Sequence, residues 1–160
     1  MDVSVRTARE ADAAAIASLT LQLGYDLTPA AAASRLSRLL LRRDHLVVVA
    51  EHGGRVVGWM HIAVSEHVES ESVAVIHGLV ADKDHRRKGI GHLLIARAEQ
   101  WTRDQGCSVV RLTSSGARTE AHQFYERVGF ARLRTQYAFA KSVGDEADGN
   151  LRRFVPRVDL

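Results

Sequence analysis

Several features that would assign this chain to a specialised class of protein are scarce or missing. One cysteine, Cys107, stands among 160 residues, so no disulfide can form within the chain, and a free thiol fits a reducing interior. No apolar run approaches the roughly 20 residues that a membrane-spanning helix needs. The N-terminus lacks the apolar segment of an export signal. These absences predict a cytoplasmic protein that does not associate with a membrane.

Motifs for binding metals and nucleic acids are also missing. The chain has eight histidines, but no H-E-x-x-H or C-x-x-C spacing is present, so we predict no metal site. The net charge of +3 is mild and suits an anionic ligand. The cations gather at one turn and do not alternate with aromatic residues, which argues against nucleic acid as a partner.

Hydrophobic periodicity and turn residues predict an alternating order of strands and helices. The expected elements are a strand at 3–7, helices at 10–23 and 28–43, a hairpin of strands at 45–51 and 55–64, a strand at 73–81, a helix at 89–105, a strand at 108–114, a helix at 118–129, and one or two strands at 130–141. This order predicts an α/β fold around one mixed sheet. We expect one domain at 1–143 and a C-terminal tail at 144–160.

The turn before the predicted helix at 89–105 concentrates positive charge and glycine. The cations of Arg86-Arg87-Lys88 are followed directly by Gly89-Ile90-Gly91. A helix N-terminus has unpaired N–H groups and the positive end of the helix dipole. Glycine lets a ligand approach the backbone closely. In this strand–turn–helix context the pattern predicts a phosphate site, with a solvated surface turn as the alternative.

The spacing separates this turn from two common phosphate-binding loops. A P-loop needs G-x-x-x-x-G-K-[ST], which is absent. A dinucleotide-binding turn needs G-x-G-x-x-G, but its third glycine position is Leu94. What remains is R-x-x-G-x-G, from Arg86 to Gly91. Together with A-x-x-F-Y-E-x-x-G-F, from Ala121 to Phe130, it resembles the two signatures of the GNAT superfamily of N-acetyltransferases, and the element order agrees from about residue 3 to 141.

The resemblance implies a fold and an acetyl-CoA site. The fold is a mixed, mostly antiparallel central sheet flanked by helices and splayed between the fourth and fifth strands. Backbone amides of the turn would hold the pyrophosphate of acetyl-CoA: Arg86, Arg87, Lys88, Gly89, Ile90 and Gly91. The backbone of Leu79, Val80 and Ala81 would pair with the pantetheine arm, whose amides an open strand edge can satisfy.

Tyr125 corresponds to the tyrosine of the second signature, which the family places to protonate the departing thiolate as a general acid. A core aromatic residue is the alternative, although its neighbour Phe124 fits that part better. Many relatives have asparagine three residues before Ala121, where it bonds the pantetheine; here that position is Arg118. Arg118 would bind the phosphates of the cofactor or point into solvent.

The general base is harder to assign. Some relatives carry a glutamate on the cofactor strand, but by alignment that position lies close to Val75, which cannot take a proton. His77 lies two residues further and so on the same face, and it can relay a proton through water. A structural histidine is the open alternative. Three glutamates precede the strand and either attract a cationic amine or form a solvated loop: Glu66, Glu69 and Glu71.

The acceptor pocket has no motif. By resemblance it borders the segment between the first two helices, so Tyr25 and Asp26 are candidates for substrate contact. The implied reaction is direct transfer of acetyl from acetyl-CoA to a primary amine of a small molecule or peptide. The rival hypothesis is a CoA-binding sensor without catalysis. The tail after Gly144 either docks on a second subunit, which would make a homodimer, or is disordered.

Overall fold

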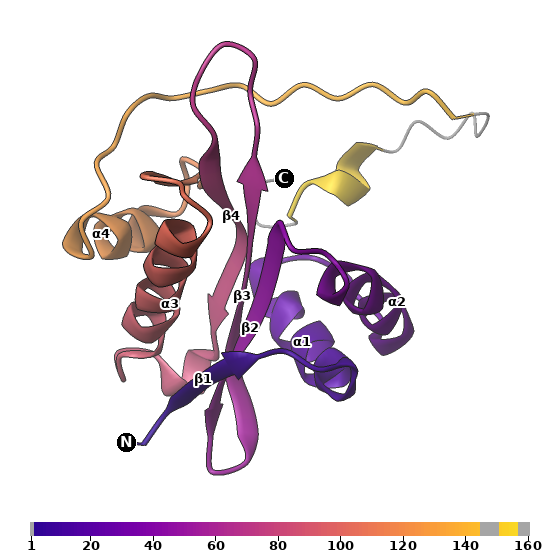
Figure 1. Cartoon of the computed structure of the whole chain (residues 1–160). Coiled ribbons are helices and arrows are strands. Elements are labelled where there is room, and N and C mark those ends of the chain that lie inside the picture. The colour runs from indigo at the N-terminus through magenta and orange to yellow at the C-terminus, as the bar shows by residue number, and fades with distance from the viewer. Residues whose placement is uncertain (1, 145–150, 157–160) are drawn as a thin grey trace.

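The computed structural model describes residues 2–144 and 151–156, and it is built around one sheet (Figure 1). Its five strands lie in the order β1-β2-β3-β4-β5. They are β1 (Ser4–Thr7), β2 (His45–His52), β3 (Arg55–Ser65), β4 (Val73–Ala81) and β5 (Val110–Leu112). β1 to β4 pair antiparallel, whereas β5 runs parallel to β4. The predicted mixed, mostly antiparallel sheet is confirmed.

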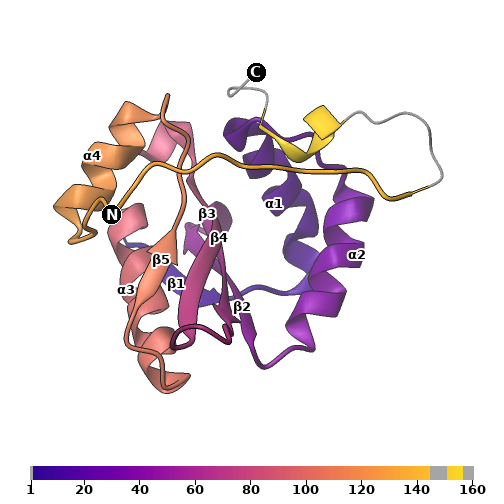
Figure 2. The same cartoon turned by 90° about the horizontal axis from the view of Figure 1, so that it is seen from above.

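Among the described residues, four α-helices cover the sheet. They are α1 (Ala13–Thr20), α2 (Pro29–Leu40), α3 (Ile90–Asp104) and α4 (Thr119–Arg127), with 3-10 turns at Glu10–Asp12, Leu21–Leu23, Lys83–His85 and Leu151–Phe154. α1 and α2 lie on one face, and α3 lies on the other with α4 beside it (Figure 2). Among the described residues, no helix combines the length and the apolar character that crossing a bilayer requires.

The ends of the helices follow the signals in the sequence. The Thr28 hydroxyl accepts a hydrogen bond from the Ala31 N–H at 3.1 Å, and Pro29 opens α2. Gly24 closes the first helical segment with a φ of 90°, and Gly106 follows α3 with a φ of 75°. The predicted helices at 10–23, 28–43, 89–105 and 118–129 therefore exist, shortened by a few residues.

Each face of the sheet packs its own apolar layer. Toward α3 the fully buried side chains are Val48, Met60, Ile62, Ile90 and Leu94. Toward α1 and α2 the layer consists of Ile16, Leu36, Val47 and Val49. Alternation along β2 and β3 sends neighbouring residues to opposite layers, and burying one such side chain stabilises the fold by about 1.5–3 kcal/mol relative to exposing it.

β4 and β5 separate soon after they meet. Their pairing covers Ala74 with Val110, Val75 with Arg111, and Ile76 with Leu112. On the β3 side, the register shifts between His61 and Ile62, so that His77 is an extra residue in a bulge. β4 then continues to Ala81 with β3 as its only strand partner among the described residues. The predicted splay between the fourth and fifth strands is confirmed.

The expected strands at 130–141 do not form, and that prediction is wrong. No strand is found between residues 130 and 141, and every residue from 131 to 144 is exposed. The segment runs as an extended chain from α4 across to the side of α1 and α2 (Figures 1 and 2). Alternating apolar residues favour a strand only where a sheet edge is within reach, and this segment meets none in its own chain. The predicted tail at 144–160 falls partly outside the described residues.

Candidate functional site

The turn between β4 and α3 has a strained backbone. Arg87 has a φ of 62°, the only positive φ at a non-glycine position among the described residues, and Gly89 has a φ of 80°. Left-handed residues in a turn direct successive N–H groups toward one point and form an anion-binding concavity. The turn leads into the 15-residue helix α3, whose N-terminus adds its dipole. Strain at Arg87 costs of order 1–3 kcal/mol, which indicates a function at this turn.

The two glycines of the turn have different tasks. A side chain on Gly89 would meet nothing within 4 Å, so glycine is needed there for its positive φ. Gly91 lies inside α3, and a β-carbon there would stand 2.6 Å from Cζ of Phe124. Gly91 therefore makes room for α4 against the first turn of α3, in addition to the predicted approach of a ligand.

A network anchors the turn from the α1 side. The Gln22 amide donates to Oδ1 of Asp82 at 3.1 Å, and the Lys83 N–H donates to Oε1 of Gln22 at 2.9 Å. His85 Nδ1 lies 3.0 Å from Oδ2 of Asp82. Hydrogen bonds from Gln22 and then from His85 hold the pKa of Asp82 below its usual value. Sequence reasoning missed Gln22 and Asp82, because no local pattern joins residues 60 positions apart.

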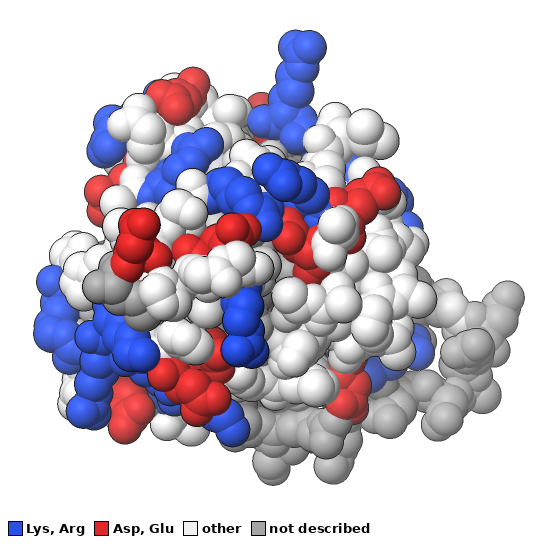
Figure 3. All heavy atoms as spheres, turned by 90° about the horizontal axis from the view of Figure 1, so that it is seen from below, with Lys and Arg blue, Asp and Glu red and all other residues white. Residues whose placement is uncertain are grey.

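The cations of the turn stay accessible. Arg86, Arg87 and Lys88 are all exposed, so they can reach an anion without breaking contacts of the core. Figure 3 shows the molecule from below Figure 1, the end at which this turn lies; Lys and Arg are interspersed with Asp and Glu over that face. A broad basic surface of the kind that binds nucleic acid is therefore not visible on this face.

Beyond the bulge, β4 offers a free edge. Leu79 pairs with Met60 and Val80 pairs with Trp59 on the β3 side, while the pairing with β5 has already ended. The predicted pantetheine residues Leu79, Val80 and Ala81 thus lie on a strand whose other edge an extended, amide-bearing ligand can fill. Ser114, two residues after β5, has a buried hydroxyl oxygen with no hydrogen-bond partner. Such an orphaned group costs about 1–3 kcal/mol, and a ligand in the gap between β4 and β5 can satisfy it.

These donors match the chemistry of acetyl-CoA. Its pyrophosphate is a dianion that suits the concave turn at Arg87 and Gly89 and the cations beside it. Its pantetheine carries amides that suit the free edge of β4 and the unpaired hydroxyl of Ser114. The residues present therefore fit the cofactor. Ser114 was not predicted, since a lone serine after a strand gives no signal in the sequence.

Tyr125 lies on α4 in an aromatic cluster. Its ring centroid is 5.5 Å from that of Phe124 and 5.7 Å from that of Phe130. Phe124 packs on the core, as the sequence predicted, and its ring meets His92 edge-on at 5.6 Å. Burial raises the pKa of the Tyr125 phenol, opposed by the positive charge of Arg118. The phenol is therefore protonated at neutral pH and able to donate.

Arg118 stands at the N-cap position of α4 and is exposed. Its side chain caps no N–H group, so the start of α4 is held by other bonds. The Arg118 N–H donates to the Ser115 carbonyl at 3.1 Å, and His122 Nε2 lies 2.8 Å from the same oxygen. The guanidinium reaches Tyr125 electrostatically, which brings these two predicted site residues together.

Three imidazoles stack across neighbouring strands on the face that α1 and α2 cover. The ring centroids of His45 and His61 are 5.2 Å apart, and those of His61 and His77 are 5.0 Å apart. His45 Nδ1 lies 2.9 Å from His61 Nε2. Burial, and then the charges of His77 and His45, lower the pKa of His61 to about 4. Burial and then the charge of His45 also lower the pKa of His77, so the stack is neutral at pH 7.

The stack places the predicted base, His77, against His61 on one side, while His77 itself stays exposed. The bulge in β4 turns His77 toward His61, which confirms the face expected from its two-residue spacing to Val75. Beside it, Gly78 leaves space for the Trp59 ring, because a β-carbon on Gly78 would stand 2.6 Å from Cη2. The indole Nε1 of Trp59 is buried without a hydrogen-bond partner. Sequence reasoning missed His61 and Trp59, because the register between strands determines which residues they contact.

The remaining predicted residues lie on loops. Tyr25 and Asp26 lie between the 3-10 turn at Leu21–Leu23 and α2, and the Tyr25 side chain is 37% exposed. The loop between β3 and β4 exposes Glu66, Glu69 and Glu71. Exposure fits the interpretation of a solvated loop. Among the described residues, no group of three or more histidine, cysteine or acidic side chains is arranged to hold a metal ion.

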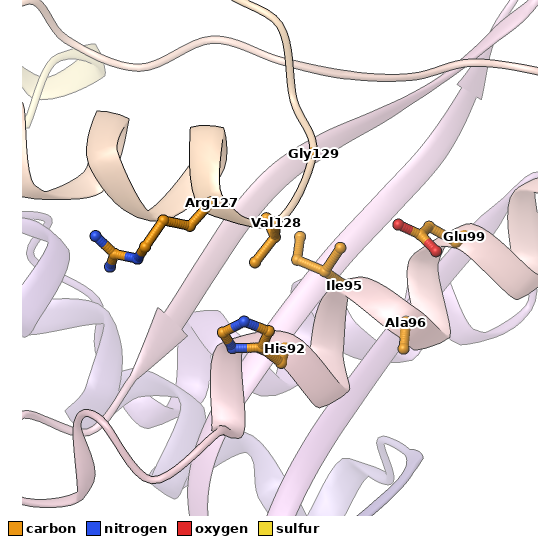
Figure 4. A pocket seen from close by; sticks show the side chains of 7 residues that line it. All are labelled: His92, Ile95, Ala96, Glu99, Arg127, Val128 and Gly129. Atoms are coloured by element: carbon orange, nitrogen blue, oxygen red, sulfur yellow. The ribbon is translucent and has the colours of Figure 1, made fainter.

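A shallow hollow of about 370 Å³ lies between α3 and the end of α4 (Figure 4). Its lining residues are His92, Ile95, Ala96, Glu99, Arg127, Val128 and Gly129. None of the predicted cofactor or catalytic residues is among them. The hollow is therefore separate from the turn and the strand edge described above.

Comparisons with known proteins agree with the geometry. Residues 14–130 match the Acetyltransferase (GNAT) family. An aminoglycoside N(6')-acetyltransferase of Klebsiella aerogenes is 30% identical over 129 residues, which cover 74% of this chain and 84% of that protein. One of Stenotrophomonas maltophilia is 29% identical over 79% of this chain and 85% of that protein.

Two other relatives are matched over less of their length. An uncharacterized N-acetyltransferase of Methanocaldococcus jannaschii is 32% identical over 94 residues, and the match spans 58% of this chain but 42% of that protein. For the aminoglycoside N(6')-acetyltransferase of Serratia marcescens, the match is 29% identical and spans 48% of this chain and 52% of that protein. The chain thus spans about half the length of these two relatives.

Solved structures share the fold. AAC(6')-Iy in complex with a bisubstrate analogue of CoA and acetylneamine superposes with a TM-score of 0.79 at 18% identity, covering 89% of this chain and 99% of that one. An acetyltransferase of Trypanosoma brucei superposes with a TM-score of 0.72 at 25% identity, over 88% of this chain and the whole of that one. The chain therefore belongs to the GNAT family of acetyltransferases, whose cosubstrate is acetyl-CoA.

Proposed function

We propose that this chain transfers the acetyl group of acetyl-CoA directly to a primary amine of a small molecule. The observation that carries the proposal is the adjacency of two features on one strand–turn–helix unit. The free edge of β4 ends in the concave turn at Arg87 and Gly89, so a ligand with a pyrophosphate and an amide-bearing arm matches both at once. The catalytic domain would comprise residues 1–143.

The cofactor would lie along this unit with its backbone contacts made by the predicted residues. Amides between Arg86 and Gly91 would bind the pyrophosphate, and Leu79, Val80 and Ala81 would pair with the pantetheine. When bound, acetyl-CoA supplies a thioester carbonyl. An N–H near Val80 on the open edge of β4 is the candidate donor to the carbonyl oxygen as negative charge develops there. The register turns the N–H of Val80 itself toward Trp59 on β3 and leaves those of Leu79 and Ala81 facing the open edge. Arg118, exposed at the start of α4, is a candidate partner for the cofactor's phosphates.

Tyr125 would act as the general acid. The sulfur that leaves the acetyl group takes up a proton, and a phenol whose pKa is raised by burial holds that proton at neutral pH. The Phe130 ring at 5.7 Å and Phe124 at 5.5 Å fix the orientation of the phenol. The phenolate that forms is stabilised by the nearby charge of Arg118, and it regains its proton from solvent.

His77 would act as the general base. An amine attacks only as the free base, so an ammonium substrate must lose a proton to the protein first. His77 has a lowered pKa and is neutral at pH 7, so it can take that proton directly or through one water molecule. His61 lies against it, with its Nε2 2.9 Å from Nδ1 of His45, and would orient the His77 ring without competing for the proton.

The acceptor would lie on the face covered by α1 and α2, opposite α3. Tyr25 and Asp26 are the proposed contacts, because their loop adjoins that face and a carboxylate attracts an ammonium group. The names of the Klebsiella and Stenotrophomonas relatives identify aminoglycosides as acceptors of those proteins. We therefore propose small polycationic amines as the first class to test. Cys107, buried with a free thiol, supports a cytoplasmic location.

The cofactor part of the proposal is tested by calorimetric titration. Acetyl-CoA should bind the folded protein, and a pantetheine fragment without the pyrophosphate should bind at least tenfold more weakly. Absence of heat with acetyl-CoA, in a sample whose circular dichroism shows intact folding, would overturn the proposal. Equal affinity for the fragment would remove the role of the turn at residues 86–91.

A sensor that binds acetyl-CoA without catalysis is the second candidate. Val75 stands where some relatives carry a basic glutamate, and Arg118 stands where many carry asparagine. Tight binding of acetyl-CoA together with no release of thiol in the presence of any amine would favour this alternative. Release that depends on the amine would exclude it.

A further inference from the structure

The hollow between α3 and α4 lies apart from the proposed acetyl-transfer site and has no task in it. Its volume of about 370 Å³ lies within the range of about 300–1,000 Å³ that is usual for small-molecule sites. α3 forms one wall, from His92 to Glu99, and the end of α4 forms the other, from Arg127 to Gly129. The hollow is thus large enough for a small ligand and has its walls on two helices.

The floor of the hollow is apolar. Ile95 lies at its centre (Figure 4) and is buried, with an exposed fraction of 3%. Val128 lies beside it and packs on the core, and Ala96 adds a methyl group. Water on such a floor finds few hydrogen-bond partners, so a ligand whose middle is apolar displaces it with a gain in free energy.

The two sides of the hollow carry opposite charges. Glu99 lies on one side and Arg127 on the other, with Ile95 and Val128 between them (Figure 4). Both charged side chains are exposed, and among the described residues neither has an ion-pair partner. Two opposite charges that line one hollow without pairing with each other suit a ligand that carries both charges in the reverse order.

Contacts between the helices hold the walls in place. Phe124 of α4 lies against Gly91 of α3, where a β-carbon would stand 2.6 Å from Cζ of the ring. The ring of His92, which lines the hollow, meets Phe124 edge-on at 5.6 Å. The Phe130 N–H donates to the Tyr125 carbonyl at 2.9 Å and fixes the chain where α4 ends. A ligand that bridges preformed walls of this kind loses little affinity to their reorganisation.

We propose that the hollow is a second ligand site and binds a short zwitterion of the size of a dipeptide. The carboxylate of the ligand pairs with Arg127, whose guanidinium forms two parallel hydrogen bonds to such a group. Its ammonium group pairs with Glu99, and its apolar middle covers Ile95 and Val128. A free α-amino acid carries both charges on one carbon and reaches one side only, whereas two extended residues span about 7 Å.

The first test is calorimetric titration of the full chain with the dipeptide alanyl-valine and with two blocked forms of it. The N-acetylated form lacks the ammonium group, and the C-terminal amide lacks the carboxylate. The free dipeptide should bind, and each blocked form should bind at least fivefold more weakly, because it leaves one charged wall without a partner. Absence of binding by the free dipeptide, or equal affinity for the three peptides, would overturn the proposal.

Single substitutions locate the binding in the hollow. Glu99→Gln and Arg127→Gln should each weaken binding of the free dipeptide at least fivefold, and both side chains are exposed, so the fold should be kept. Glu99→Gln should not weaken binding of the N-acetylated form further, because the ammonium that it serves is already gone. Arg103→Gln on α3 and Glu120→Gln on α4 change exposed charges outside the hollow and should bind like the wild type. Unchanged affinity in either hollow variant, or an equal loss in the controls, would contradict the assignment.

The same titration in saturating CoA separates the hollow from the acetyl-transfer site. CoA carries no acetyl group, so no transfer to the dipeptide can occur. The affinity for alanyl-valine should be unchanged within twofold, since the hollow shares no residue with the proposed cofactor contacts. Displacement of the dipeptide by CoA would place it in the cofactor site and overturn the proposal. Failure of the dipeptide to bind leaves the proposed acetyl transfer untouched, because that function is tested with acetyl-CoA and amines.

Discussion

Gly91 and Phe124 pack against each other where α3 meets α4: a β-carbon on Gly91 would stand 2.6 Å from Cζ of the ring. Phe124 cannot simply turn aside, because its ring is held between those of His92 and Tyr125 at 5.6 and 5.5 Å. The first turn of α3 follows the proposed phosphate site, and α4 carries the proposed general acid. This contact therefore sets the distance between the two halves of the site.

Gly91→Ala should destabilise the fold. Overpacking costs about 1–3 kcal/mol, and the better helix propensity of alanine returns up to about 1 kcal/mol, so a net loss of about 1 kcal/mol is expected. Urea unfolding measures this loss in the free energy of unfolding. Gly116→Ala is the matched control, because a β-carbon there meets nothing within 4 Å and its φ is not positive. Equal stability of the two variants would show that α4 adapts without cost.

Gly89→Ala should weaken acetyl-CoA binding more than it weakens the fold. Its φ of 80° costs alanine about 1–2 kcal/mol, and relaxing that strain would misdirect the N–H groups of the turn. Gly106→Ala imposes a similar strain at a φ of 75°, but at the opposite end of the 15-residue helix α3. Calorimetry should give at least a tenfold loss of affinity for Gly89→Ala and none for Gly106→Ala. A similar loss in both would refute the assignment of the turn.

Tyr125→Phe should lower kcat by about 10²–10⁴ and leave the affinity for acetyl-CoA nearly unchanged, since the hydroxyl acts on the leaving sulfur. The phenol is lost while the ring contacts to Phe124 and Phe130 remain. Tyr137→Phe removes a hydroxyl from an 88% exposed ring and should change neither constant. An unchanged kcat in Tyr125→Phe would rule out Tyr125 as the general acid.

Stability should fall as the pH drops from about 6.5 to about 4, in part through His61. Its pKa is about 4 in the folded chain and near 6.5 when unfolded, so the unfolded state binds the extra proton in this window. This difference in pKa corresponds to a change on the order of 3 kcal/mol in the free energy of unfolding. His45 and His77, which face His61, also have lowered pKa values and act in the same direction. His61→Gln should flatten the stability curve between pH 4 and 6.5; an unaltered slope would rule out this origin.

Local signals in the sequence were sufficient to predict most of the helices and strands. Thr28-Pro29 and Gly106 mark helix ends by rules that involve only neighbouring residues, and the spacing of Gly89 marks the turn that we propose binds phosphate. The segment at 131–143 shows the limit of such rules. Alternating apolar residues from Leu133 to Phe139 predict a strand, but no strand forms there, because a strand also needs a sheet edge that no local pattern encodes.

Parts of the site depend on contacts that no local pattern encodes. The bond between Gln22 and Asp82 joins residues 60 positions apart, and the stack of His61 on His77 follows from a bulge in the register. The positive φ of Arg87 is a strained state that arginine does not favour by itself. Distant packing decides each of these features, so only the folded chain reveals them.

The most direct test of acetyl transfer is mass analysis of the products after mixing the purified protein with acetyl-CoA and one amine at a time, from aminoglycosides, polyamines, amino acids and peptides. The account predicts that at least one small polycationic amine is acetylated on nitrogen, in an amount equal to the free CoA released. Binding of acetyl-CoA with no acetylated product from any amine would contradict it.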